Sequence, residues 1–248
     1  MKTPRLQDAR HTGGNEPYPL NAPTREVVVA MGKHIAYCKA TRANVFTGDD
    51  WAEAFAYAVG GHSLSSPLGI ADVPLDGIAW SLKTIKNKLP FEATVARLIV
   101  GRCSPDYSYG IYDPHKDVAQ TGKAVLGIWN ERVNIAEARF RPLRMAILVR
   151  SEDLTQFTFF EENALRYSPA QFVWEWNVRG NLEARDVATG KHVFTWQPHG
   201  AQLTLHQAIP PYATRFTLRS PGVLDRGSIL RQIGFDESWV GIVPDAGR

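Results

Sequence analysis

The sequence predicts a mixed α/β (α+β) fold, in which helices flank a mixed central sheet and a β-rich C-terminal region is added. Helical spacing and strand-like runs alternate over residues 24–168, whereas strand patterns dominate after residue 169. The chain has 248 residues, enough for one large core. Hydrophobic residues make up 44% and charged residues 21%, the balance of an ordinary globular protein.

The N-terminal half supplies the helices and the first strands. Residues 25–42 carry apolar side chains close to helical spacing, and the capping oxygens of residues 47–50 precede a second apolar helix. Asp76-Gly77 is the residue pair that favours a two-residue hairpin turn. The elements expected here are helices at 25–42 and 51–59, hairpin strands at 70–75 and 78–85, a strand at 94–100, a loop at 102–117, a helix at 123–140, and strands at 143–149 and 155–160.

The C-terminal part is expected to add an antiparallel sheet. Its strands are predicted at 172–178, 182–187, 192–197, 202–207 and 214–218, with a short helix at 226–233. We therefore expect three regions: a flexible N-terminal arm (1–23), a core (24–168) and a β-rich extension (169–248) that belongs to the same globule.

Composition restricts the class of protein. The net charge of +3 permits an anionic partner without requiring one. Two cysteines, Cys38 and Cys103, exclude a disulfide framework and a cysteine-based metal centre, and they suit a reducing cytoplasm. The sequence shows neither a signal peptide nor an apolar run long enough to span a bilayer, so we expect a cytoplasmic protein without a membrane partner.

The hairpin brings chemically useful residues together. Counting from the turn pairs Val73 with Trp80 and Asp72 with Ser81. One face is then entirely apolar: Ala71, Val73, Leu75, Ile78, Trp80 and Leu82. The other face carries Asp72, Pro74, Ala79, Ser81 and Lys83. A carboxylate and an ammonium are thus expected to lie within reach of one small ligand.

These residues resemble the active site of PD-(D/E)XK nucleases, the superfamily that includes type II restriction endonucleases. In that family an aspartate at the end of one strand and an acid-x-lysine on the next form the catalytic centre. The matching residues here are Asp72 and Lys83, in Gly69-Ile-Ala-Asp72 and Trp80-Ser-Leu-Lys83. The resemblance covers roughly residues 50–100 and implies a restriction-endonuclease-like core.

Ser81 departs from the family pattern, because it stands where an acid is usual. A divalent ion normally needs further negative charge. Glu53 is the best supplier, as the only charged residue in the apolar stretch 51–59; some relatives likewise take an acid from the preceding helix. Asp72 and Glu53 would then bind Mg²⁺, Ser81 would contact a metal-bound water, and Lys83 would orient the attacking water.

The resemblance implies a Mg²⁺-dependent endodeoxyribonuclease that cleaves double-stranded DNA at a specific sequence, as a homodimer if it cuts both strands of a palindrome. The β-rich extension is the expected recognition element, because it offers donors suited to major-groove reading. The residues expected to contact DNA are Arg102, Asn177, Arg179, Asn181, Arg185 and Lys191.

Other readings of the same residues remain open at this point. Asp72 and Lys83 could form an ordinary surface ion pair, Glu53 could point outward, and Asp76 could serve only the turn. The alternatives to the sequence-specific endonuclease are a DNA repair or junction nuclease with the same hairpin, and a non-catalytic DNA-binding protein with a decayed site. Outside nucleic acids, the tryptophans of the extension could form a carbohydrate-binding or scaffolding platform.

Overall fold

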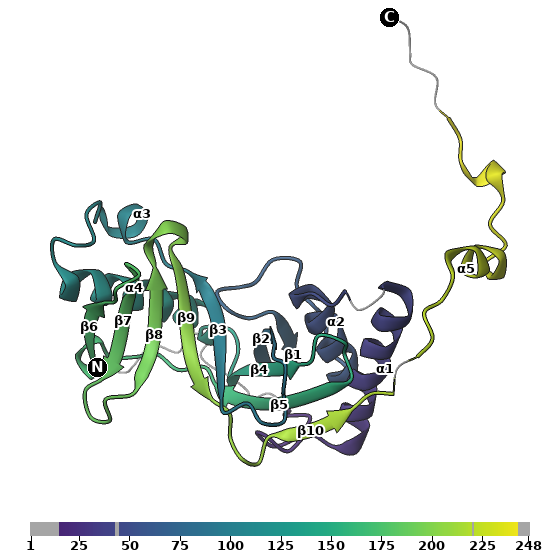
Figure 1. Cartoon of the computed structure of the whole chain (residues 1–248), viewed down its shortest axis with the longest axis horizontal. Coiled ribbons are helices and arrows are strands. Elements are labelled where there is room, and N and C mark those ends of the chain that lie inside the picture. Colours follow the sequence, from purple (N-terminus) through teal and green to yellow (C-terminus); the bar gives the residue numbers. More distant parts are fainter. Residues whose placement is uncertain (1–14, 43–44, 220, 243–248) are drawn as a thin grey trace, which may run out of the picture.

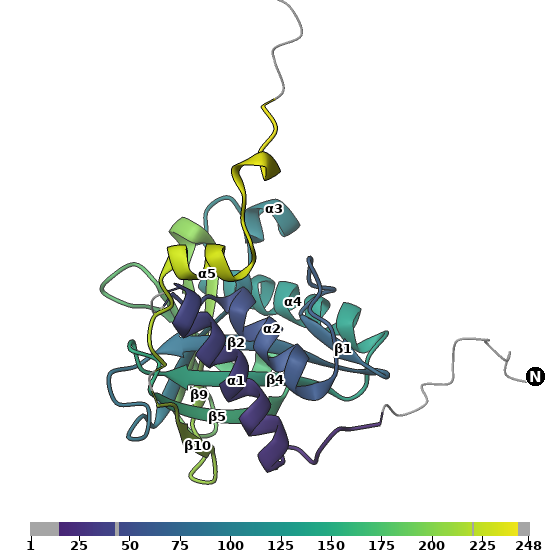
Figure 2. The same ribbon diagram turned by 90° about the vertical axis from the view of Figure 1, so that its right-hand side faces the viewer.

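The fold is mixed α/β and contains two five-stranded sheets (Figures 1 and 2). The computed structural model describes residues 15–42, 45–219 and 221–242. The first sheet is mixed, in the order β1-β2-β4-β5-β10. Its strands are β1 (Val73–Leu75), β2 (Ile78–Lys86), β4 (Leu143–Arg150), β5 (Gln156–Asn163) and β10 (Thr214–Thr217).

The second sheet is antiparallel throughout, in the order β3-β9-β8-β7-β6. Its strands are β3 (Val95–Arg102), β6 (Phe172–Trp176), β7 (Leu182–Asp186), β8 (His192–Gln197) and β9 (Gln202–Ala208). The predicted boundary near residue 169 does not follow this division. β3 leaves the predicted core for the second sheet, and β10 returns from the predicted extension to the first.

Helices cover both faces of the first sheet. α1 (Arg25–Arg42) and α2 (Gly48–Val59) lie on one face, where Trp51 and Phe55 of α2 pack against Phe159, and Phe55 also packs against Trp80. α4 (Val118–Glu137) lies between the other face and the second sheet, and its buried Trp129 joins the apolar residues of both sheets. Three shorter elements are α3 (Pro105–Tyr109) in the predicted loop, α5 (Arg226–Gln232) and a 3₁₀ turn at Glu237–Trp239. Both α5 and this turn extend away from the body in Figure 1.

No helix in the described part of the chain combines the length and the apolar character that crossing a membrane requires.

The segment before α1 is packed rather than free. Tyr18 is buried, and its hydroxyl donates to Oε1 of Glu161 at 3.3 Å, while Asn21 donates to the Glu161 carbonyl at 2.7 Å. Glu161 is itself fully buried, which raises its pKa, and it also accepts a hydrogen bond from Trp80 Nε1 at 2.7 Å. The predicted flexible arm is therefore wrong for residues 15–23, because a buried carboxylate needs these donors. Residues 1–14 of that arm lie outside the described residues.

The contact of α4 with the second sheet is close enough to test by substitution. A Cβ added at Gly122 would lie 2.4 Å from Cγ of Trp174, inside the van der Waals contact distance. We expect Gly122→Ala to lower the free energy of unfolding by about 1–3 kcal/mol, as overpacking in a core does. Urea denaturation measures this change.

Gly32→Ala in α1 is the matched control, because nothing lies within 4 Å of its added Cβ. It should raise the free energy of unfolding by about 0.5–1 kcal/mol, since glycine is unfavourable inside a helix. Equal effects of the two substitutions would contradict the close packing of α4 on β6.

Candidate functional site

The hairpin turn sets the positions of the candidate catalytic residues. Asp76 and Gly77 have φ angles of 42° and 86°, the left-handed values that a two-residue turn of this kind requires. Val73 pairs with Trp80 and Leu75 with Ile78, so the predicted register is correct. The first strand is shorter than predicted and begins at Val73, but the Asp72 N–H still donates to the Trp80 carbonyl at 2.8 Å.

Asp72, Ser81 and Lys83 form one cluster. Oδ2 of Asp72 accepts hydrogen bonds from the Leu82 N–H at 2.7 Å and from the Ser81 hydroxyl at 3.3 Å. Lys83 Nζ donates to Ser81 Oγ at 2.9 Å and lies 3.7 Å from the same Asp72 oxygen. Within the described residues, Oδ1 of Asp72 has no hydrogen bond or ion pair.

The cluster is more enclosed than a surface ion pair. The side chains of Asp72 and Lys83 are only 20% and 18% exposed. Burial lowers the pKa of Lys83 below its ordinary range, and the negative charge of Asp72 opposes this shift. Ser81 and Ala79 are buried on the same face, because α4 and the second sheet cover it. Ala79 and Ser81 therefore lie on the predicted face, whereas the prediction is wrong at Ala71, which was assigned to the opposite face and packs in the core on this side of the sheet.

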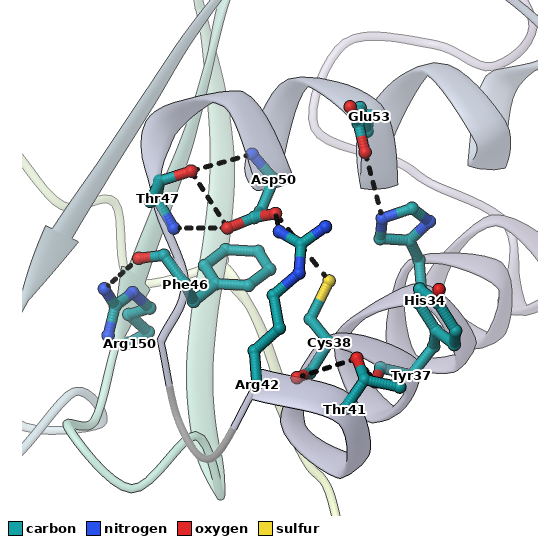
Figure 3. A network of polar contacts seen from close by, with 10 residues as sticks. All are labelled: His34, Tyr37, Cys38, Thr41, Arg42, Phe46, Thr47, Asp50, Glu53 and Arg150. Atoms are coloured by element: carbon teal, nitrogen blue, oxygen red, sulfur yellow. Dashed lines mark hydrogen bonds and ion pairs between the residues drawn. The ribbon is translucent and has the colours of Figure 1, made fainter. Parts of the chain in front are cut away.

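Glu53 does not join this cluster. Its side chain is 56% exposed, and Oε2 lies 3.8 Å from Nε2 of His34 on α1 (Figure 3). Trp51 and Phe55 face the sheet, so Glu53, two residues from each, lies about 200° around the helix from both. The proposed metal pair of Asp72 and Glu53 is thus not brought together. Within the described residues, no group of three or more metal-ligating His, Cys, Asp or Glu side chains occurs.

Three of the residues expected to bind DNA do meet. Asn177, Arg179 and Asn181 line one cavity of about 600 Å³ at the outer face of the second sheet. The Asn177 amide is used within the turn, where it donates to Glu183 at 2.7 Å and accepts from the backbone N–H groups of Arg179 and Asn181. The side chains of Arg179 and Asn181 have no such partner among the described residues, which leaves their donors available.

Arg97, Thr204 and Gln197 also line this cavity, although they are not among the residues predicted to contact DNA. Arg97 lies on β3, where exposed and buried residues alternate. This alternation in the sequence could have identified Arg97 as an exposed side chain. The sequence does not show, however, that β3 belongs to the second sheet. β3 is the strand of that sheet that lies beside the first sheet (Figure 1).

The other predicted contact residues lie elsewhere. Arg185 is on the outer face of β7 and lies 3.6 Å from Glu183. Arg102 lines a separate cavity of about 490 Å³ with residues of α3. Lys191 follows the β7–β8 turn, at the opposite end of the sheet from the β6–β7 turn that holds Arg179. These three residues are therefore not part of the cavity around Arg179.

Two histidines stand beside the cavity. Thr195 Oγ1 lies 3.0 Å from Nε2 of His192 and 2.9 Å from Nε2 of His206, and the two rings are 4.1 Å apart. Burial, together with the nearby His192 and Arg97, lowers the pKa of His206 to about 4, and Glu183 opposes this shift. His206 is consequently neutral at pH 7, so it adds no charge to this face.

Comparisons with protein-family models, with curated proteins and with solved structures found no match for this chain. The resemblance to PD-(D/E)XK nucleases therefore rests on the residues and the geometry of the hairpin.

The pKa of His206 predicts how stability depends on pH. Its pKa is about 4 in the folded protein against 6.5 for an ordinary histidine, so the unfolded chain takes up the proton first as the pH falls. This contribution to stability is complete above pH 6.5 and is lost between about pH 6.5 and 4. Between pH 7 and pH 4.5 we expect the Tm of His206→Gln to fall by less than the Tm of the wild type. His62→Gln, at an exposed loop histidine, is the control. Equal losses in all three proteins would show that His206 does not titrate in this way.

Proposed function

We propose that this chain is a Mg²⁺-dependent endodeoxyribonuclease that cleaves double-stranded DNA, of the PD-(D/E)XK type and specific for a sequence. The single observation that carries the proposal is the cluster of Asp72, Ser81 and Lys83 on the hairpin, held by contacts of 2.7–3.7 Å. The carboxylate and the ammonium are largely enclosed, so they cost desolvation energy that an exposed surface ion pair would avoid.

The donor atoms at the hairpin fit Mg²⁺ that shares its ligands with a substrate. The chain offers Oδ1 of Asp72, which is unused among the described residues, and no second carboxylate joins it from Glu53. Mg²⁺ commonly binds through one or two carboxylates together with phosphate oxygens and water. When bound here with DNA, it would polarise the scissile phosphate and lower the pKa of a bound water.

Lys83 has the clearest role among the residues of the chain. Its ammonium is aligned by Ser81 Oγ at 2.9 Å and by the Leu82 carbonyl at 3.0 Å. From this position Lys83 can donate a hydrogen bond to a phosphoryl oxygen and offset the charge that develops on it. Ser81, in the position of the usual acid, acts as a positioning residue, since its hydroxyl links Lys83 to Asp72.

Recognition of DNA is assigned to the outer face of the second sheet. Arg179, Asn181 and Arg97 surround one cavity there, and such side chains supply the bidentate donors that major-groove reading needs. Cleavage of both strands at a symmetric site would require two copies of the chain, so the proposal includes a homodimer in the cytoplasm.

A second candidate, a DNA-binding protein without nuclease activity, is favoured by one specific observation. Glu53 faces away from the hairpin and Ser81 brings no charge, so Asp72 is the only acid in the cluster. A repair or junction nuclease would use the same hairpin on a different DNA structure.

Plasmid cleavage with and without Mg²⁺ tests the proposal. The wild type should give discrete fragments with Mg²⁺, and both Asp72→Asn and Lys83→Ala should reduce the rate by roughly 100-fold or more. Glu53→Gln is the matched control. It removes a carboxylate that faces away from the hairpin, so it should cleave at the wild-type rate.

Binding of duplex DNA without Mg²⁺ separates the candidates. If the wild type binds DNA but does not cleave it, the nuclease proposal is wrong and the non-catalytic DNA-binding protein is supported. If neither binding nor cleavage occurs, both candidates fail. If Glu53→Gln instead abolishes cleavage, Glu53 takes part in the metal site after all.

Arg179→Ala tests the recognition surface. Loss of one bidentate base contact should weaken binding to the preferred sequence by about 1–3 kcal/mol and relax specificity at one position. Arg25→Ala, at the exposed start of α1, is the control that removes the same charge. Fluorescence anisotropy on matched and mismatched duplexes measures both effects. An equal loss of affinity for all duplexes would show that Arg179 contacts phosphates instead of bases.

A further inference from the structure

A second cavity lies where the parallel strands of the first sheet end. β2 and β4 run parallel, with Lys86 paired to Arg150 at their final residues. The cavity beside this edge has a volume of about 710 Å³. Ligands of α/β proteins often bind at the carboxyl ends of parallel strands. Three cationic residues line the cavity: Lys86, Lys88 and Arg150.

Arg150 is a buried cation with which no carboxylate of the described residues forms an ion pair. The residue is 4% exposed, and Nη2 donates to the Phe46 carbonyl at 2.6 Å (Figure 3). Its Nε and Nη1 atoms have no hydrogen-bond partner, and no carboxylate within the described residues forms an ion pair with it. An unpaired buried charge is costly, so an anionic ligand is the natural complement.

The nearby acids do not provide that complement. The Asp50 carboxylate is already used by Arg42 and by the N–H and hydroxyl of Thr47 (Figure 3). Glu152 pairs with Lys86 at 3.0 Å and is 85% exposed. The Asp153 carboxylate accepts a hydrogen bond from Thr155 at 2.9 Å. Glu152 and Asp153 also line the cavity, so its three cations exceed its carboxylates by one charge, and Lys88 has no ion pair among the described residues.

We propose that this cavity binds a phosphate group. The planar guanidinium of Arg150 and the ammonium groups of Lys86 and Lys88 are the donors that a tetrahedral oxyanion takes. The phosphate is either a diester of the DNA backbone or a free phosphate, such as inorganic phosphate or a nucleotide. This site is separate from the hairpin cluster, because Arg150 and Phe46 lie on the side of the sheet that faces α1 and α2. It does not depend on the nuclease proposal.

A pair of double variants of the full chain tests the site. Lys86→Gln/Lys88→Gln removes two exposed cations that line the cavity, so the fold should be kept. Lys33→Gln/Lys116→Gln removes two exposed lysines outside the cavity and changes the net charge equally. Titration with inorganic phosphate by calorimetry, and with duplex DNA without Mg²⁺ by anisotropy, should be run on both variants and on the wild type.

We expect the cavity variant to lose roughly 10-fold or more in affinity for at least one of these probes, while the control stays within about 2-fold of the wild type for phosphate. Loss for phosphate alone identifies a free phosphate as the ligand. Loss for DNA beyond that of the control, with a smaller salt dependence, identifies the DNA backbone. If the two double variants behave alike with both probes, the proposal is overturned.

Discussion

The parallel pairing of β2 with β4 is the constraint on which the rest of the structure depends. Two parallel strands cannot be joined by a tight turn, so the chain between them must cross from one end of the sheet to the other. In this protein the crossing contains β3, which enters the second sheet, and α4, which returns across the face of the first. The same pairing therefore buries the Ser81 face of β2 and places the ends of both strands at one edge.

Enclosure gives the hairpin its chemical character. An exposed aspartate and lysine would interact weakly in water, but here their shared environment holds both at fixed positions and makes each charge more costly to keep. The cluster contains one carboxylate and one ammonium, whose charges balance each other, and in the proposed nuclease Mg²⁺ and a DNA phosphate would be bound in addition. A carboxylate and an ammonium held at fixed positions are what the proposed catalytic centre requires.

The sequence predicts the hairpin well because its rules are local. The turn pair Asp76-Gly77 and the alternation of side chains are sufficient to place Asp72 beside Ser81 and Lys83. Glu53 was misplaced because α2 packs against both the sheet and α1, so most of its surface is apolar and one exposed stripe remains for Glu53 and Tyr57. The sheet to which β3 belongs depends on contacts far along the chain, and Arg97 could not be joined to Arg179 without it. For the same reason, the sequence does not show that Lys86, Lys88 and Arg150 line one cavity.

The exchange of strands between the two sheets limits how the binding surface of the protein can evolve. β3 lies early in the chain and completes the later sheet, while β10 lies late and completes the earlier one. No single cut in the chain separates the sheets, so the outer face around Arg179 cannot be transplanted as a module or replaced by recombination. A new binding preference would have to arise by substitution of individual side chains on a scaffold that stays whole.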